Sequence, residues 1–142
     1  MSRRRRAEKR IIAPDPRFND QELARFINRL MVKGKKTIAQ RITYSALDII
    51  QEESSREPLE VFQQALRNAT PAVEVRPKRI GGSTIQVPTE LRPVRSEALA
   101  MRWLIRGARS RNGMPMRQGL AQELMDASRG EGTAVRRREE LH

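Results

Sequence analysis

Apolar residues recur at helical spacing soon after the start of the chain. Following Asp20, a residue type that favours the N-cap position, they fall at i, i+3, i+4, i+7 and i+8. The members of this stripe are Leu23, Phe26, Ile27, Leu30 and Met31. The stripe predicts an amphipathic helix that ends at Gly34.

Two further helices are predicted before residue 71. The second helix is expected to turn five residues inward: Ile38, Ile42, Ala46, Ile49 and Ile50. The third is expected to begin near Pro58 and to stop before Pro71, since proline favours a helix start and opposes continuation. Its predicted inner face is Leu59, Phe62, Leu66 and Ala69.

Residues 73–92, VEVRPKRIGGSTIQVPTELR, break the helical pattern. Two β-prone runs, 73–80 and 84–91, flank the turn residues Gly81, Gly82 and Ser83. Paired glycines between such runs predict a β-hairpin, because glycine accepts the positive φ that tight turns need.

This hairpin is an unusual one for a protein core. Arg76, Lys78 and Arg79 surround Pro77, and proline removes a hydrogen-bond donor from a strand ladder. The sequence therefore predicts a charged ribbon that leaves the helical body and is suited to reach along a groove of folded nucleic acid.

Residues 96–110, SEALAMRWLIRGARS, are apolar at almost every position apart from three arginines. Arg102, Arg106 and Arg109 fall at i, i+4 and i+7, and Arg95 extends the row. The pattern predicts a helix that is buried around most of its circumference and exposes one line of arginines. A fifth helix is predicted over 115–128, and Thr133 is expected to cap a last segment, AVRRREELH.

Together these elements predict a mainly α-helical fold. We expect a single domain of five to six helices over residues 20–142, with one protruding β-hairpin at about 73–90. Residues 1–19 are expected to form a basic arm that is disordered until a partner binds, since they lack apolar periodicity and carry seven cations against two acids.

The composition of the chain points to a polyanionic partner. Its 142 residues include 29 Lys and Arg against 17 Asp and Glu, giving a formal net charge of +12. Such an excess, dominated by arginine, favours binding to phosphates. No cysteine is present, and no apolar run approaches the ~20 residues that span a membrane. The basic start is not followed by an apolar stretch, so a secretory signal is not expected.

Catalytic and metal-binding arrangements have little support in the sequence. The single histidine is His142, so neither a serine–histidine pair nor a histidine metal site is expected. The adjacent acids 52–53 and 139–140 would not converge on one site of a helix. The GGS turn lacks the spacing of a phosphate-binding loop. We therefore expect a protein that is not an enzyme and that needs no cofactor or metal.

Clusters of basic residues are the candidate functional features. They are the row described above, the lysines around Gly34 (Lys33, Lys35 and Lys36), and Arg136, Arg137 and Arg138. The last three stand in the first turn after Thr133, where a helix dipole disfavours cations. Nucleic-acid binding is the favoured function. An alternative is a DNA-architectural protein that uses the hairpin as a minor-groove arm, although the GGS tip carries no apolar wedge.

Several motifs, in order along the chain, resemble the bacterial-type small-subunit ribosomal protein seven family. They are RRRRAEKR with PDPRF, FINRLMVKGKK, RPKRIGGSTIQVPTELRPVRSEALAMRWLIRGARSR and GEGTAVRRREELH. The resemblance implies a six-helix domain with an extended hairpin. It also implies a structural protein that binds the 3′ major domain of small-subunit ribosomal RNA, organises assembly of the subunit head, and contacts exit-site transfer RNA and the messenger RNA path through its hairpin.

The resemblance also implies which residues bind RNA. Expected ribosomal RNA contacts, including the last cluster above, are Arg3, Arg4, Arg5, Arg6, Lys9, Arg10, Lys35, Lys36, Arg76, Lys78, Arg79, Arg92, Arg95, Arg102, Arg109, Arg111, Arg136, Arg137 and Arg138. Expected neighbours of transfer and messenger RNA are Arg79, Gly81, Gly82 and Ser83.

The implied partners also include neighbouring small-subunit proteins of the head and platform, and no membrane. The implied location is the small ribosomal subunit in the cytoplasm, with a plastid or mitochondrial ribosome left open. The chain departs from the family pattern at Pro77, where a small polar residue is usual, and at His142, beyond which relatives continue with a helical stretch.

Overall fold

Six helices and one antiparallel pair of strands make up residues 12–142, the part of the chain that the computed structural model describes, without the side chains of Val75 and Arg76. In chain order they are α1 (Gln21–Leu30), α2 (Lys36–Ser54), α3 (Pro58–Ala69), β1 (Val73–Ile80), β2 (Ser83–Glu90), α4 (Pro93–Arg109), α5 (Met116–Ser128) and α6 (Gly132–Leu141). The mainly α fold with one hairpin is confirmed.

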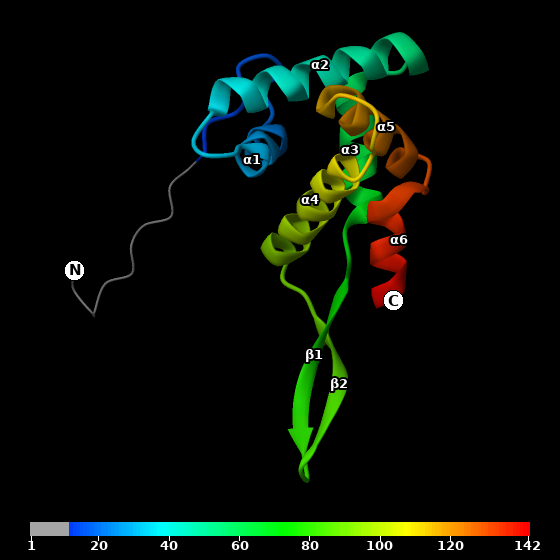
Figure 1. Cartoon of the computed structure of the whole chain (residues 1–142). Coiled ribbons are helices and arrows are strands. Elements are labelled where there is room, and N and C mark those ends of the chain that lie inside the picture. Colours follow the sequence, from blue (N-terminus) through cyan, green and yellow to red (C-terminus); the bar gives the residue numbers. More distant parts are fainter. Residues whose placement is uncertain (1–11) are drawn as a thin grey trace, which may run out of the picture.

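The core lies where α3, α4 and α5 meet, and α1, α2 and α6 cover it (Figure 1). The rings of Phe26 and Phe62 meet edge to face with centroids 5.3 Å apart, which joins α1 to α3. Leu104, Leu120 and Leu124 are fully buried between α4 and α5. One continuous apolar cluster thus holds all six helices together.

The predicted start of α1 is confirmed, but its predicted end is wrong. Asp20 is the N-cap, and its Oδ1 accepts a hydrogen bond from the amide of Leu23 at 2.8 Å. The helix ends at Leu30, four residues before Gly34. Lys33 and Gly34 both have positive φ, and the amide of Lys35 donates to the carbonyl of Val32 at 3.1 Å. Gly34 therefore serves a tight turn and not the end of the helix.

The predicted inner face of α2 is rotated by about one residue. Its buried residues are Ala39, Thr43, Ala46, Leu47 and Ile50, whereas Ile38 is 48% exposed. Ala46 and Ile50 are buried as predicted, whereas Ile42 and Ile49 are only partly buried. In α3, Val61 and Ala65 join the buried face and Leu59 is only partly buried.

The arginine row of α4 is confirmed as an exposed line on a buried helix. Ten of its residues are buried, whereas Arg102, Arg106 and Arg109 are exposed. The helix begins at Pro93, three residues earlier than predicted. Proline is suited to this first turn because its missing amide hydrogen would have had no partner there.

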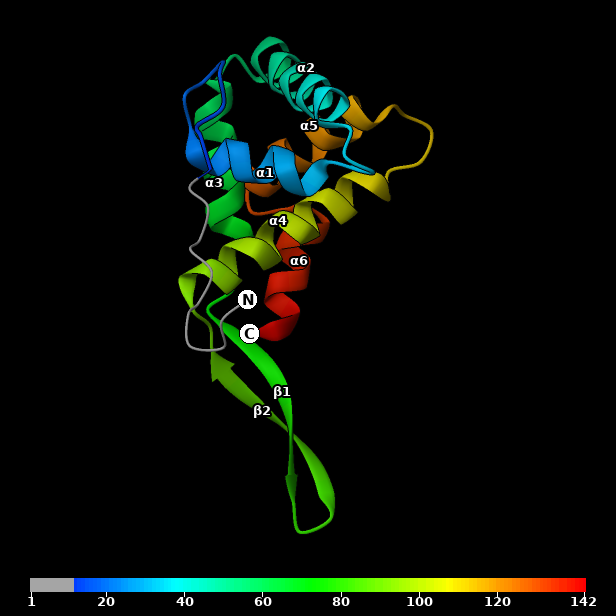
Figure 2. The same cartoon turned by 90° about the vertical axis from the view of Figure 1, so that its left-hand side faces the viewer.

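The hairpin is a regular ribbon that projects from one end of the helical body (Figure 2). Ile80 pairs with Ser83, so the turn is Gly81-Gly82 alone, and the prediction that Ser83 belongs to the turn is wrong. Both glycines have positive φ, 54° and 83°, as a type I′ turn requires. This turn matches the twist of the strands, which is why two residues are enough.

The register explains why the ribbon tolerates proline. The pair that closes a two-residue turn is hydrogen-bonded, and the pairs alternate from there. Pro77 faces Gln86 and Pro88 faces Val75, both at non-hydrogen-bonded positions. The missing amide hydrogens therefore remove no bond from the ladder, and Pro77 does not interrupt β1.

Residues 12–19 belong to the body, which corrects the expectation that the arm extends to residue 19. The buried carboxylate of Asp15 accepts hydrogen bonds from the amides of Arg17, Phe18 and Asp20 at 3.1, 2.7 and 2.8 Å. It also accepts one from the hydroxyl of Tyr44 at 3.2 Å. Burial, followed by the charge of Asp15, raises the pKa of Tyr44, so the hydroxyl stays protonated and donates.

We expect Asp15→Ala to lower the free energy of unfolding by about 2–4 kcal/mol, because three backbone donors would lose their acceptor. Asp48→Ala is the matched control. Asp48 forms an exposed ion pair with Arg17, so its loss is expected to cost less than about 1 kcal/mol. Urea unfolding followed by circular dichroism measures both variants, and equal effects would contradict the role assigned to Asp15.

Candidate nucleic-acid interface

Four arginines surround one hollow where α1 crosses α4. The hollow, of about 340 Å³, is lined by Arg29 of α1 and by Arg102, Ile105, Arg106 and Arg109 of α4. No carboxylate lines it, and none of the four arginines forms an ion pair with another described residue. We call it the arginine pocket. The guanidinium of Arg109 donates to the carbonyl of Leu30 at 3.5 Å. Four guanidinium groups without a carboxylate partner repel one another, and an anion between them would relieve that repulsion.

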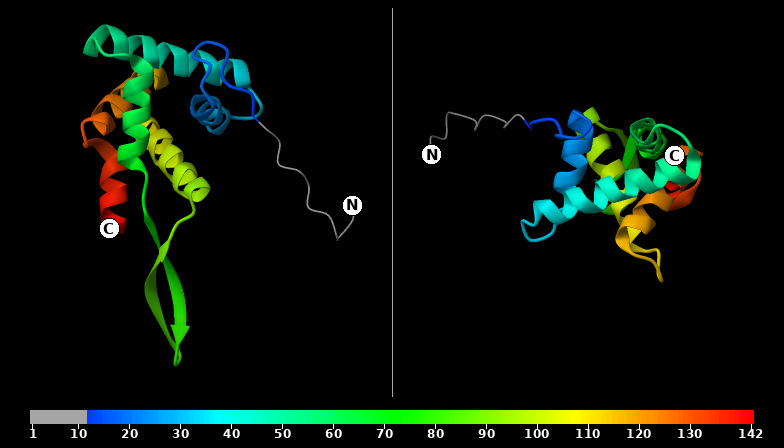
Figure 3. Two further views of the ribbon diagram at one scale, coloured as in Figure 1. Left: turned by 180° about the vertical axis from the view of Figure 1, so that it is seen from behind. Right: turned by 90° about the horizontal axis from the view of Figure 1, so that it is seen from above.

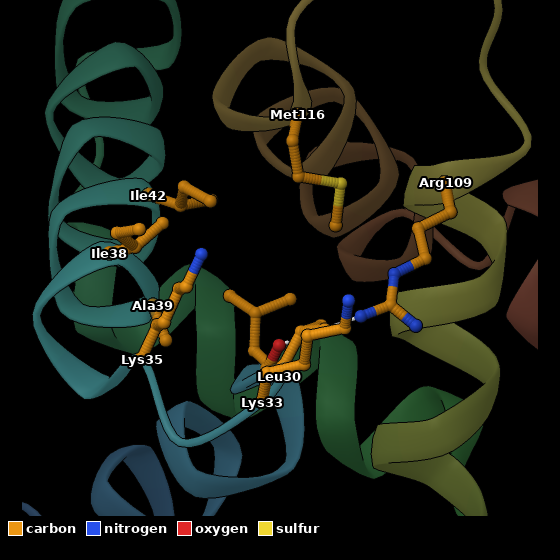
Figure 4. Close-up of a pocket in the computed structure, with 9 residues that line it drawn as sticks. Leu30, Lys33, Lys35, Ile38, Ala39, Ile42, Arg109 and Met116 are labelled. Atoms are coloured by element: carbon orange, nitrogen blue, oxygen red, sulfur yellow. Dashed lines mark hydrogen bonds between the residues drawn. The ribbon is translucent and has the colours of Figure 1, made fainter.

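A second hollow adjoins the arginine pocket through Arg109. It has a volume of about 390 Å³, a cationic rim of Lys33, Lys35 and Arg109, and apolar walls that include Ile42 and Met116. Figure 4 shows Ile42 of α2 on one side and Arg109 of α4 on the other. Lys33 is held at φ 54°, a conformation costly for a residue other than glycine, and this strain often marks functional sites.

The other described basic residues that were predicted to bind RNA do not line these two hollows. Lys36, Arg92, Lys78, Arg79, Arg136 and Arg137 are exposed, and Arg138 is half-buried. The side chain of Arg76 is not described, and Arg3, Arg4, Arg5, Arg6, Lys9 and Arg10 lie outside the described residues. The tip residues Gly81, Gly82 and Ser83 are exposed at the far end of the ribbon.

Arg95 and Arg111 are engaged within the protein. Arg95 forms an ion pair with Glu74 of β1 at 2.9 Å, which links α4 to the root of the hairpin. Arg111 contacts the carboxylates of Glu123 and Asp126 at 2.8 and 2.7 Å. Burial lowers the pKa of Arg111, but hydrogen bonds to the two acids outweigh it and raise the pKa overall. These contacts give Arg111 a structural role.

Glu123 is a fully buried acid that fixes α6 against α4. Its Oε2 accepts from Arg111, and its Oε1 accepts from the amide of Ala134 at 3.0 Å, in the first turn of α6. The carboxylate also lies so close to Gly107 that a Cβ there would stand 2.5 Å from Oε1. One side chain of α5 therefore contacts both α4 and α6, which lie side by side.

The structure also corrects two predictions about the last helix. Thr133 is not the cap, because α6 begins at Gly132 and its N-cap is Glu131, with no side-chain capping bond. The arginines at 136–138 do not stand in the first turn. They lie beyond it, because α6 begins at Gly132, and Arg138 belongs to the last turn, where the helix dipole favours cations. Sequence reasoning missed Glu123 and Arg29. Glu123 stands among apolar residues in LAQELMDA, a signal that could have flagged it.

The part of the chain that the structure describes shows no group of three or more side chains able to hold a metal ion. Within the same residues, none of the helices is both long and apolar enough to traverse a lipid bilayer.

The helical body, its carboxylate-free arginine pocket and its projecting basic ribbon are suited to a polyanionic partner, and comparison with known proteins identifies the family. The profile of ribosomal protein S7p/S5e matches residues 2–142, so the chain belongs to that family and is not an enzyme.

Its similar relatives are named small ribosomal subunit protein uS7. The protein from Maricaulis maris is 56% identical over 142 residues, which are 100% of this chain and 91% of the relative. The Paracoccus denitrificans protein is 54% identical with the same coverage. The Thermotoga maritima protein is 52% identical over 140 residues, 99% of this chain and 90% of the relative.

The contact between Glu123 and Gly107 predicts whether Gly107→Ala stabilises or destabilises the protein. Helix propensity alone would make Gly107→Ala stabilising by up to about 1 kcal/mol. We expect it instead to destabilise the protein by about 1–3 kcal/mol, because the added methyl group would collide with the buried carboxylate.

Chemical unfolding in a double-mutant cycle with Glu123→Ala tests the cause of this effect. In the Glu123→Ala background the collision is absent, so Gly107→Ala should become neutral or favourable. A loss of the same size in both backgrounds would show that Glu123 is not what requires glycine at this position.

Proposed function

We propose that this chain is a structural constituent of the small ribosomal subunit, where it binds the 3′ major domain of the ribosomal RNA and organises assembly of the subunit head. Its family and the name shared by its relatives support this role. The observation that carries RNA binding is the arginine pocket, where four cations converge without a carboxylate. RNA phosphates are the anions a ribosomal protein meets in quantity.

The proposed RNA-binding surface runs from the α1–α2 turn along α4 to α6 and the hairpin. Its residues are Arg29, Lys33, Lys35, Lys36, Lys78, Arg79, Arg92, Arg102, Arg106, Arg109, Arg136, Arg137 and Arg138, together with Arg76 and the basic residues between Arg3 and Arg10. Arg95 and Arg111 remain proposed RNA contacts as well, although each also has a carboxylate partner within the protein.

The hairpin has a separate proposed role. Its tip contacts exit-site transfer RNA and the messenger RNA path, while the cations along the ribbon fix it on ribosomal RNA. Its projection from the body supports this division, since the tip can reach beyond the RNA that the helices bind. The chain works in bacterial-type ribosomes of the cytoplasm, beside other small-subunit proteins of the head and platform, and a plastid or mitochondrial ribosome is the alternative location.

One observation favours the alternative of a DNA-architectural protein. Ile80 and Ile85 lie on one face of the ribbon just behind the tip and are 53% and 46% exposed. Apolar side chains at such a position can wedge between base steps. Competition distinguishes the two functions: duplex DNA should displace the folded ribosomal RNA domain poorly, whereas equal competition would favour the DNA-binding alternative.

Cosedimentation tests the main proposal directly. In a sucrose gradient of a cell lysate, the protein should travel with small ribosomal subunits at low salt and leave them at high salt. A protein that remains at the top of the gradient under all conditions would contradict the proposal.

RNA binding should depend strongly on salt. If about eight phosphates are neutralised, the slope of log affinity against log salt should be roughly −7. Arg106→Gln should lower its magnitude by about one unit, because Arg106 lines the arginine pocket. Arg56→Gln is the control with the same charge change, at an exposed position between α2 and α3. Filter binding from low to moderate salt measures the slopes, and identical slopes for both variants would exclude a specific role for the pocket.

The register of the hairpin allows a clean shortening of its tip. Deleting Arg79, Ile80, Ser83 and Thr84 leaves Gly81-Gly82 between Lys78 and Ile85, the next hydrogen-bonded pair. The shortened protein should assemble into subunits near the normal yield but change the occupancy of exit-site transfer RNA on purified ribosomes. Arg79→Gln controls for the lost cation. Abolished assembly with normal exit-site binding would refute the proposed division of roles.

A further inference from the structure

A groove runs between α4 and α6 and reaches the root of the hairpin. It consists of two adjoining hollows of about 230 and 220 Å³ that share Trp103, Arg106 and Arg137. The upper hollow adds Thr133 of α6, and the lower one adds Arg102 and Leu99 of α4. We call this the α4–α6 groove. Figure 3 shows α6, in red, beside the root of the ribbon.

The walls of this groove are cationic and its floor is apolar. Arg102 and Arg106 come from α4 and Arg137 comes from α6, so positive charge lines both sides. Trp103 and Leu99 are buried, at 7% and 6% exposure, and the small part of each that lines the groove is apolar. Glu74 is the one carboxylate among the described residues that line either hollow, and it is already paired with Arg95.

The groove continues into the arginine pocket. Arg102 and Arg106 line both, because they stand on the exposed edge of α4 between the two hollows. A chain that lies in the groove can therefore pass over α4 and meet cations along its whole path, of which Arg102 and Arg106 have no carboxylate partner among the described residues. This favours a ligand with regularly spaced negative charges, such as a phosphodiester backbone, over an acidic peptide with a few side-chain carboxylates.

We propose that the α4–α6 groove binds a single-stranded segment of RNA, with base surface against Trp103 and phosphates at Arg102, Arg106 and Arg137. The inference deepens the proposed function, on which it rests. Proteins bind single strands by combining a cationic groove with an aromatic side chain that contacts the bases. A duplex does not satisfy the apolar floor, since its base faces are stacked inside.

The groove is formed before any ligand binds. Glu123 holds the first turn of α6 and the carboxylate packs against Gly107 of α4, so the backbones on both sides of the groove are fixed. Arg137 keeps only an exposed contact of 3.5 Å with Glu140, which is weak enough to exchange for a phosphate.

Tryptophan fluorescence, excited where Tyr44 does not absorb, reports on this groove because Trp103 is the only tryptophan of the chain. The probes for the full-length protein are an oligouridine about ten nucleotides long, an abasic strand with the same number of phosphates, an RNA duplex and oligoglutamate. Oligouridine should quench Trp103 and bind roughly tenfold more tightly than the abasic strand, since each contacting base contributes to affinity. The duplex and oligoglutamate should leave the emission unchanged.

Arg137→Gln and Arg136→Gln form a matched pair with the same charge change on neighbouring residues of α6, of which Arg137 lines the groove. Arg137→Gln should weaken oligouridine binding several-fold more than Arg136→Gln, with unchanged thermal unfolding for both. An equal loss of oligouridine affinity in the two variants, or equal quenching by the abasic strand, would overturn the proposed binding site in the groove. Neither result would contradict RNA binding by the chain as a whole.

Quenching by oligoglutamate or by the duplex alone would assign the groove to a protein or to helical RNA and would also overturn the inference. If none of the RNA probes binds at low salt, the proposed function fails together with it.

Discussion

The buried carboxylate of Glu123 is the constraint on which the arrangement of the functional surface depends. It joins α5 to the start of α6, pairs with Arg111 in the α4–α5 connection, and packs on α4 at Gly107. A fully buried charge is costly unless its partners are satisfied, so these contacts must form together. These contacts help to fix the relative position of α4 and α6, and with it that of their arginines.

A second consequence is that the cations divide into two groups. Arg95 and Arg111 hold secondary elements together through acids. A second group lines one pocket that holds no carboxylate, so a bound anion would relieve the repulsion among its members. They are Arg29, Arg102, Arg106 and Arg109. A net charge of +12 favours a polyanionic partner, and the distribution of the acids decides where the proposed RNA contacts lie.

The register of the hairpin keeps its backbone hydrogen bonds complete despite two prolines. Its two-residue turn fixes the register, and the register places both prolines where a strand pair needs no amide hydrogen. The ribbon is therefore regular without a core beneath it. The ribbon keeps its strand-to-strand hydrogen bonds where it projects from the body, and the side chains on both of its faces can contact partners.

The sequence by itself determined the helical class, the hairpin, the Asp20 cap, the arginine row of α4 and the family resemblance, because these depend on periodicity, turn chemistry and local motifs. The tertiary structure alone decided which face of α2 is buried, that Asp15 anchors residues 12–19, and that Arg29 meets Arg102 across α1 and α4. It also separated Arg111 from the free cations. These features depend on residues distant in the chain, whose pairing is set by how whole helices pack.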